Sequence, residues 1–164
     1  MIALVLGGAR SGKSAFAERM VARLPGPVTY VATAQVCDPD MAGRVAAHQA
    51  RRPPEWRTIE VIGDLAGPVA ALDGTVLIDS LGPWTAGADD FQPDTDAFCQ
   101  ALRQRRGDTV IVSEEVGFGV HPSSDAGRRF RDALGTINQA IAELADEVVL
   151  VVAGRPLSLG PRQR

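Results

Sequence analysis

Residues 2–14 of this 164-residue chain read IALVLGGARSGKS. The apolar run Ile2–Leu6 predicts a buried strand, and a helix is expected to begin at Lys13. Between them lies the spacing Gly-x-x-x-x-Gly-Lys-Ser, which is the phosphate-binding loop pattern in the strand-to-helix context that supports it. We therefore expect the phosphates of a nucleotide to be bound by Gly7, Gly8, Ala9, Arg10, Ser11, Gly12, Lys13 and Ser14.

The rest of the chain alternates further apolar runs with helical segments. The runs are continuous rather than alternating, which is typical of strands covered on both faces. This predicts an α/β fold of the P-loop NTPase type, with a mostly parallel sheet between helices. The expected strands are Ile2–Leu6, Val28–Thr33, Thr75–Ser80, Thr109–Glu114 and Glu147–Ala153, and the expected helices are Lys13–Leu24, Asp38–Arg52, Leu65–Leu72, Thr95–Arg106 and Ser124–Ala145.

The length and composition of the chain limit the classes of protein to which it can belong. The length of the chain is suited to a single domain, 1–164. Within it, residues 82–96 are expected to form an irregular surface loop. A net charge of −3 provides no general attraction for nucleic acid. Cys37 and Cys99 have no ligand-type neighbours and are interpreted as buried thiols. The N-terminus enters a strand at once, so we expect no membrane insertion and a cytoplasmic protein.

The loop also predicts a metal. Lys13 would neutralise the β and γ phosphates, and the Ser14 hydroxyl would bind Mg²⁺. A second metal ligand should lie at the carboxyl end of another parallel strand. Asp79 is the first candidate and the pair Glu114 and Glu115 the second, although Asp79 at a strand end is also compatible with a capping role. An acidic side chain beside the γ phosphate would act as a general base or only orient the acceptor.

A histidine stands on the basic face of the predicted helix 38–52. A step of about 100° per residue groups Arg44, His48, Arg51 and Arg52 on one side. Such a face is usually solvated, and a single histidine more often makes a structural hydrogen bond. An imidazole flanked by guanidinium groups is also a suitable nucleophile for a phosphoryl or nucleotidyl group. Spacing alone leaves both interpretations open.

Several segments in order carry a family resemblance. GGARSGKS (7–14), VATAQVCDPDM (31–41), RVAAHQARRPPEWRTIE (44–60), EEVGFGVHP (114–122) and the run from 127 to 154 resemble the bifunctional adenosylcobinamide kinase / adenosylcobinamide-phosphate guanylyltransferases. The resemblance implies phosphorylation of adenosylcobinamide, followed by transfer of GMP from GTP through a covalent guanylyl-histidine at His48. ATP, GTP or both remain as phosphoryl donors, because the loop binds phosphates and not the base. The resemblance implies a homotrimer. It also implies nucleotide contacts at the loop and at Thr33, Ala34, Gln35, Gln49, Ala50, Arg51, Arg52, Glu60 and Asp79.

Two departures from the family pattern stand out. Glu114 occupies the place where the family usually has the Asn of its NEVG motif, which adds a negative charge near the expected phosphate site. The segment after Asp79 is also shorter and less apolar than is common. Two alternatives therefore remain at this point: a P-loop kinase of a small molecule in which His48 is structural, and a nucleotide-dependent binding module.

Overall fold

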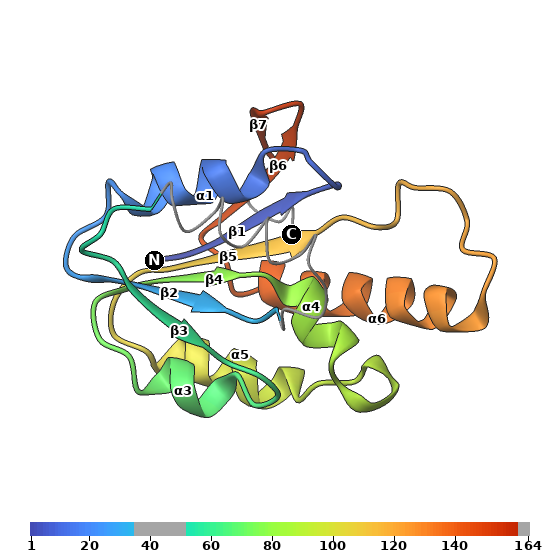
Figure 1. The fold of residues 1–164 in the computed structure, drawn as a ribbon, viewed down its shortest axis with the longest axis horizontal. Coiled ribbons are helices and arrows are strands. Elements are labelled where there is room, and N and C mark those ends of the chain that lie inside the picture. Colours follow the sequence, from blue (N-terminus) through green and yellow to red (C-terminus); the bar gives the residue numbers. More distant parts are fainter. Residues whose placement is uncertain (35–51, 161–164) are drawn as a thin grey trace.

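The computed structural model describes residues 1–34 and 52–160, and their strands form one seven-stranded sheet (Figure 1). The strand order is β3-β2-β4-β5-β1-β6-β7, and every neighbouring pair is parallel except β6 with β7. The mostly parallel α/β sheet predicted from the sequence is confirmed. The strands are β1 Ile2–Gly7, β2 Val28–Ala32, β3 Arg57–Glu60, β4 Thr75–Asp79, β5 Thr109–Glu114, β6 Glu147–Val152 and β7 Arg155–Ser158.

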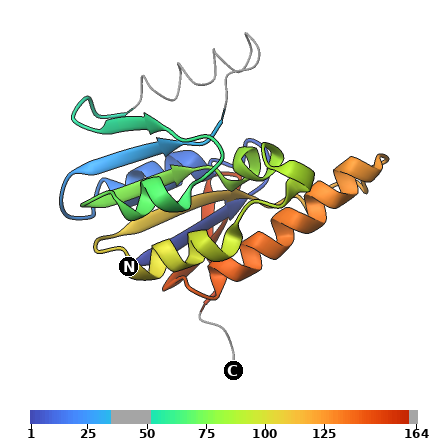
Figure 2. The same ribbon diagram turned by 90° about the horizontal axis from the view of Figure 1, so that it is seen from below.

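Helices cover both faces of this sheet. Helix α1 lies on one face, and α3, α5 and α6 lie on the other (Figures 1 and 2). The strands β1, β2, β4 and β5 point the same way, so their carboxyl ends meet at one edge, on the right in Figure 1. The helices are α1 Lys13–Val21, α3 Ala66–Ala70, α4 Leu81–Ala86, α5 Thr95–Gln104 and α6 Asp125–Ala142, with a 3₁₀ turn at Asp89–Phe91.

The sheet divides the apolar core into two clusters. On the α1 side, Ala17 and Val21 pack with strand residues such as Val5. On the other side, Leu134 and Ile141 of α6 are fully buried. The apolar stripe predicted on this helix is confirmed, because Ile137 is also buried and Phe130 and Leu144 pack against the same cluster. Continuous apolar strands are thus explained by burial on both faces.

Two strands were not predicted. β3 and β7 are the outermost strands of the sheet, each four residues long, and most of their side chains are exposed. Neither sequence, RTIE or RPLS, contains a continuous apolar run, and β7 includes Pro156, which removes a backbone donor. Short polar edge strands of this kind give no periodicity signal.

The irregular loop predicted for residues 82–96 is wrong in its first part. Leu81–Ala86 is helix α4, and its residues Leu81 and Trp84 are buried in the core. Gly82 and Pro83 are poor helix formers, which hid the helix from sequence reasoning. A proline in the first helical turn is tolerated because its missing N–H would have no partner within the helix.

Some of the remaining predictions concern described residues, and others fall outside them. Helix α1 ends at Val21 rather than at Leu24, and α6 ends at Ala142 rather than at Ala145. Cys99 is a buried free thiol, whereas Cys37 lies outside the described residues. The helix predicted at Asp38–Arg52 also lies outside them, apart from Arg52, which forms part of a bend. Among the helices in residues 1–34 and 52–160, none combines the length and apolarity needed to cross a membrane.

Candidate functional site

The phosphate-binding loop joins β1 to α1 at the carboxyl edge of the sheet. Gly12 has φ of 91° and occupies the N-cap position of α1, and the Lys13 N–H donates a 3.4 Å hydrogen bond to the Ser11 hydroxyl oxygen. Glycine adopts this left-handed conformation without the strain of a side chain. The backbone N–H groups at such a helix start, together with the helix dipole, favour an anion. The geometry predicted for Gly7–Ser14 is therefore present in the fold.

The turn between β6 and β7 packs against the backbone of the phosphate-binding loop. The Gly154 N–H donates a 2.7 Å hydrogen bond to the Ser11 carbonyl oxygen, and a side chain at Gly12 would come within 3.2 Å of the Gly154 Cα. A side chain at Gly7 would overlap the Ser11 hydroxyl and approach the Val151 carbonyl oxygen to 2.8 Å. Close backbone contacts therefore fix the conformation of the loop, and two of its glycines are required for that packing.

Lys13 is held at the mouth of the loop. Its Nζ donates to the Gly8 carbonyl oxygen at 3.4 Å and lies 3.6 Å from Oε1 of Glu114. The Lys13 side chain is 12% exposed and that of Glu114 27% exposed, so both are partly shielded from water. The second carboxylate candidate from the sequence is thus brought beside the lysine of the loop.

Glu114 is fixed by donors from the start of α4. The Ser80 hydroxyl donates to its Oε1 at 2.8 Å, and the Gly82 N–H donates to its Oε2 at 2.9 Å. A side chain at Gly82 would overlap the Glu114 carboxylate. By contrast, the Glu115 carboxylate accepts a 2.7 Å hydrogen bond from the Gly117 N–H, within the following loop. The two adjacent glutamates therefore have different partners.

The register of the sheet places the predicted acidic residues on one face. Glu60 is paired with Ala32 and Ala32 with Asp79, while Glu114 is paired with Gly7. Asp79 is paired with Val112, two residues before Glu114, and residues two apart on a strand point to the same side. Val112 belongs to the cluster beneath α1. Glu60, Asp79 and Glu114 thus share the sheet face that carries α1, at the edge where the phosphate loop lies.

Asp79 is connected to Arg52 through Tyr30. The Tyr30 hydroxyl donates a 2.9 Å hydrogen bond to Asp79 Oδ2, and the Arg52 guanidinium carbon lies 3.2 Å from the centre of the Tyr30 ring. Burial, and after it the negative charge of Asp79, raises the pKa of Tyr30 well above its ordinary value, against the opposing effect of Arg52. The phenol therefore stays protonated and remains a hydrogen-bond donor at neutral pH.

Thr33 lies at the end of β2 beside the strand that carries Asp79. Its hydroxyl donates to the Ser80 carbonyl oxygen and accepts from the Ser80 N–H at 2.9 Å. Thr33 is buried, and Ala34 is half-buried. Of the other predicted contacts, Arg52 and Glu60 are described, whereas Gln35, His48, Gln49, Ala50 and Arg51 lie outside the described residues.

Two residues of this site were not predicted, Tyr30 and Ser80. Tyr30 is the single tyrosine of the chain and lies in an otherwise apolar strand. A buried phenol needs a hydrogen-bond partner, and this requirement was the signal available in the sequence. No such signal marked Ser80, because its role depends on where α4 begins.

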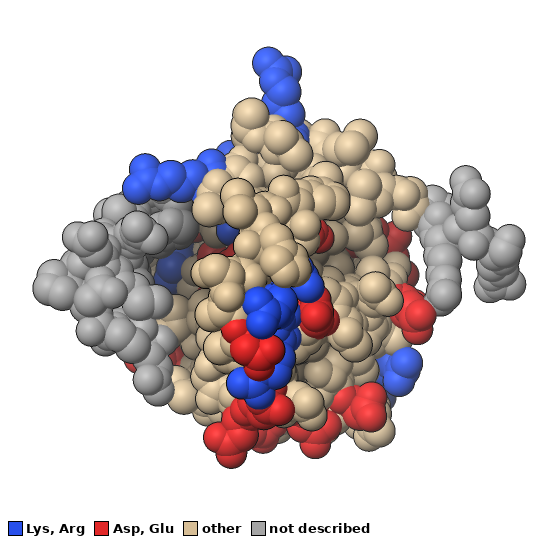
Figure 3. Space-filling model, turned by 90° about the vertical axis from the view of Figure 1, so that its right-hand side faces the viewer, with Lys and Arg blue, Asp and Glu red and all other residues tan. Residues whose placement is uncertain are grey.

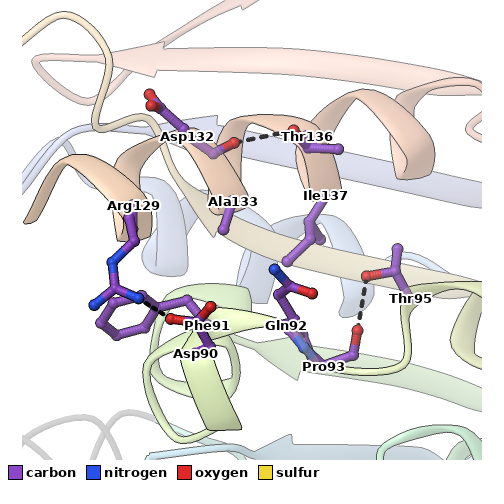
Figure 4. A pocket seen from close by; sticks show the side chains of 10 residues that line it. All are labelled: Asp90, Phe91, Gln92, Pro93, Thr95, Arg129, Asp132, Ala133, Thr136 and Ile137. Carbon is purple, nitrogen blue, oxygen red and sulfur yellow. Dashed lines mark hydrogen bonds and ion pairs between the residues drawn. The ribbon is translucent and has the colours of Figure 1, made fainter. Parts of the chain in front are cut away.

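A separate pocket of about 480 Å³ lies between α6 and the segment from Asp90 to Thr95 (Figure 4). Arg129 of α6 forms an ion pair with Asp90 at one end, and its guanidinium carbon lies 5.9 Å from the centre of the Phe91 ring. Ile137, which lines the same pocket, belongs to the core cluster on the side of the sheet opposite α1. This pocket is therefore distinct from the phosphate-loop site.

The surface at the start of α6 carries both signs of charge. Arg128, Arg129 and Arg131 each pair with an aspartate within or near the first turns of the helix. That helix end reaches the right-hand side of the molecule in Figure 1, and Figure 3 shows basic and acidic atoms side by side in one column on this face. The basic side chains here are thus largely balanced by neighbouring carboxylates.

Comparison with known proteins shows which family the chain resembles. The family model for cobinamide kinase / cobinamide phosphate guanyltransferase matches residues 3–159. The bifunctional adenosylcobalamin biosynthesis protein CobP of Pseudomonas aeruginosa is 41% identical over 165 residues, with 95% of each chain covered. The bifunctional adenosylcobalamin biosynthesis protein CobU of Salmonella typhimurium is 37% identical over 179 residues, covering 94% of this chain and 97% of the relative.

A solved structure supports the fold independently of sequence. An ATPase from the type III secretion system of pathogenic bacteria matches with a TM-score of 0.64 at 9% identity, over 96% of this chain and 56% of the ATPase. At this identity the match shows the fold alone, and it agrees with the mostly parallel α/β fold that the sequence predicted. Because the family model matches residues 3–159, which is nearly the whole chain, the chain belongs to the cobinamide kinase / cobinamide phosphate guanyltransferase family.

Proposed function

We propose that this chain phosphorylates adenosylcobinamide and then transfers GMP from GTP to adenosylcobinamide phosphate. The observation that carries the proposal is the family match over residues 3–159, which includes both the phosphate loop and the carboxyl edge of the sheet. Relatives named as bifunctional adenosylcobalamin biosynthesis proteins support it at 36–41% identity. The bound nucleotides are GTP, ATP or both, as the loop recognises phosphates and not the base.

In the kinase step, we assign the terminal phosphates of the donor to the loop Gly7–Ser14. The acceptor hydroxyl oxygen attacks the γ phosphorus, and its proton passes to a carboxylate of the site or to water. The bond from that phosphorus to the bridging oxygen breaks, and the nucleoside diphosphate leaves. Lys13, at the start of α1, would neutralise the phosphate charge. Its position beside the Gly8 carbonyl oxygen at the loop mouth supports this role.

Ser14 and Asp79 are the proposed ligands of Mg²⁺. A hydroxyl and a carboxylate are oxygen donors of the type that Mg²⁺ prefers, and phosphates and water would complete its coordination. One or two protein ligands are usual for Mg²⁺ at nucleotide sites, where the ion keeps several waters. When bound, the ion supplies positive charge against the phosphates.

In the guanylyl-transfer step, we assign the nucleophile to His48. The imidazole nitrogen attacks the α phosphorus of GTP and pyrophosphate leaves, after which the phosphate of the acceptor displaces the histidine. Arg44, Arg51 and Arg52 would stabilise the added negative charge. Support from the described residues comes from Arg52, whose guanidinium stacks on Tyr30, the ring that also holds Asp79.

The remaining nucleotide contacts are proposed along the same edge. Thr33, Ala34 and Gln35 follow β2 in the sequence, Glu60 ends β3, and Gln49 and Ala50 are next to the proposed nucleophile in the sequence. The parallel register of β2 with β3 and β4 supports grouping Glu60 with Asp79. We further propose that residues 1–164 act as one nucleotide-binding domain, that the protein is a homotrimer, and that it works in the cytoplasm.

Product analysis tests the proposal. The purified protein is incubated with adenosylcobinamide, GTP or ATP, and Mg²⁺, and the corrinoid products are separated and identified by mass. We expect adenosylcobinamide phosphate first and then the GDP-linked product with GTP, and neither product with Lys13→Ala. Accumulation of the phosphate alone favours a plain kinase, and the absence of any corrinoid product favours a nucleotide-dependent binding module.

A further inference from the structure

The starting observation is the ion pair at the phosphate loop. Oε1 of Glu114 lies 3.6 Å from Nζ of Lys13, and both side chains are partly shielded from water. The ammonium group that would meet the phosphates is therefore paired with a carboxylate of the same chain. A charge pair in this setting is screened less than one in open solvent.

The Glu114 carboxylate is held independently of the lysine. Ser80 donates to one carboxylate oxygen and the Gly82 N–H to the other. The Asn138 side chain also donates to the Glu114 backbone carbonyl oxygen at 3.2 Å, which ties the end of β5 to α6. When Lys13 turns toward a phosphate, these contacts keep the negative charge at the mouth of the loop.

A phosphate drawn to Lys13 must therefore approach a fixed like charge. Two unit charges about 5 Å apart in a partly buried site repel strongly enough to change a binding constant by a factor of ten or more. A nucleotide that carries a divalent cation brings compensating positive charge, so the same carboxylate opposes it much less.

We propose that Glu114 is a positioning residue for Lys13 that selects a metal–nucleotide complex over the free nucleotide. This inference rests on the proposed function of the loop. Glu114 holds Lys13 at the loop mouth and weakens the binding of nucleotide that arrives without a divalent cation.

Calorimetric titration with GTP, once in EDTA and once in excess Mg²⁺, tests the inference. Every protein compared, the original included, also carries His48→Ala, so that GTP binds without guanylylating the protein in the Mg²⁺ arm. In EDTA, Glu114→Gln is expected to bind GTP about tenfold more tightly than the original protein, because the substitution removes the fixed charge. In Mg²⁺ the two proteins should agree within about threefold, since the cation offsets that charge. Glu147→Gln is the matched control. Glu147 is the exposed first residue of β6 and lies at the amino end of the parallel strands, whereas Glu114 lies at the carboxyl end, so its substitution should change neither binding constant.

Thermal melting establishes that each variant is folded, and Glu114→Asn serves as a second charge-removing variant if Glu114→Gln does not fold. One result overturns the inference: the original protein binds GTP in Mg²⁺, but in EDTA the folded Glu114 variant binds GTP no more tightly than the original protein does. Failure of the original protein to bind GTP even with Mg²⁺ overturns the proposed function and this inference with it.

Discussion

The hydroxyl of Tyr30 donates a 2.9 Å hydrogen bond to Oδ2 of Asp79, and the same ring carries the Arg52 guanidinium on its face. One buried aromatic side chain, 3% exposed, thereby links the proposed metal ligand to a proposed nucleotide contact. Because the Tyr30 hydroxyl donates to one oxygen of Asp79, the phenol restricts the orientation of this carboxylate. The first two predictions follow from this arrangement.

The first prediction concerns pH. The pKa of Tyr30 is raised in the folded protein, chiefly by burial and then by Asp79, above the value of about 10 that it has when unfolded. The folded state therefore retains a proton that the unfolded state loses, so the free energy of unfolding decreases as the pH rises beyond about 10. Tyr30 is the only tyrosine in the chain, so ultraviolet titration reports this group alone.

We expect tyrosinate absorbance to appear only at a pH well above the ordinary range, together with loss of the native circular dichroism signal. In Tyr30→Phe, stability should decrease less over the same alkaline range. Ionisation of Tyr30 near pH 10 in a protein that remains native would contradict the buried hydrogen bond.

The second prediction concerns positioning of Asp79. Tyr30→Phe keeps the ring beneath Arg52 and removes the hydroxyl, so Asp79 loses one partner that holds its orientation. We expect a higher Mg²⁺ concentration for half-maximal kinase activity and a stability loss of about 1 kcal/mol. Asp79→Asn should reduce Mg²⁺-dependent turnover more severely than Tyr30→Phe does, since it removes the ligand charge itself.

The informative comparison is between turnover and melting temperature. If Asp79→Asn melts at a much lower temperature while its folded fraction keeps full turnover, the carboxylate is a structural strand-end group and not a metal ligand. An unchanged Mg²⁺ requirement in Tyr30→Phe would remove Tyr30 from the positioning role.

The third prediction concerns the connection between α6 and β5. Asn138 is buried, its side-chain oxygen accepts a 2.6 Å hydrogen bond from the Ser113 hydroxyl, and its nitrogen donates to the Glu114 carbonyl oxygen. Asn138→Ala leaves buried polar groups without these partners, at a cost of about 2 kcal/mol in the free energy of unfolding. The measurement is urea denaturation.

Gln139→Ala is the matched control for this change, because Gln139 is the next residue of the same helix and is exposed. Its effect should stay within about 0.5 kcal/mol. Equal stability of the two variants would show that the Asn138 hydrogen bonds contribute nothing to the fold.

The sequence was most informative where burial and backbone conformation are set locally. The five apolar strands and the stripe on α6 are visible because both faces of the sheet are covered, and the loop pattern is visible because its glycines are needed for close backbone packing. The strands β3 and β7 lie at the edges with exposed side chains, so nothing in their composition marks them. Helix α4 forms although it contains Gly82 and Pro83, because Leu81 and Trp84 gain burial in the core.

In the candidate site, too, some residues could be predicted from the sequence and others could not. Its metal-ligand candidates were found because they end predicted strands, and parallel register brings Asp79 and Glu114 to one face. The partners of these residues depend on tertiary contacts that spacing does not encode. Tyr30 reaches Asp79 across neighbouring strands, and Ser80 and Gly82 reach Glu114 only because α4 begins where it does.

The fourth prediction tests the two-step reaction at the proposed nucleophile. The protein is incubated with Mg²⁺ and GTP labelled on its α phosphate, and its intact mass is measured after quenching at alkaline pH, where a phosphoramidate survives. Original protein should gain the label and the mass of one guanylyl group, which is GMP less one water, and lose both when adenosylcobinamide phosphate is added. His48→Ala should gain neither while still phosphorylating adenosylcobinamide, because the kinase step requires only the loop, the metal and the acceptor. Labelling of His48→Ala at the original rate would contradict the account, as would an original protein that phosphorylates adenosylcobinamide yet never becomes labelled.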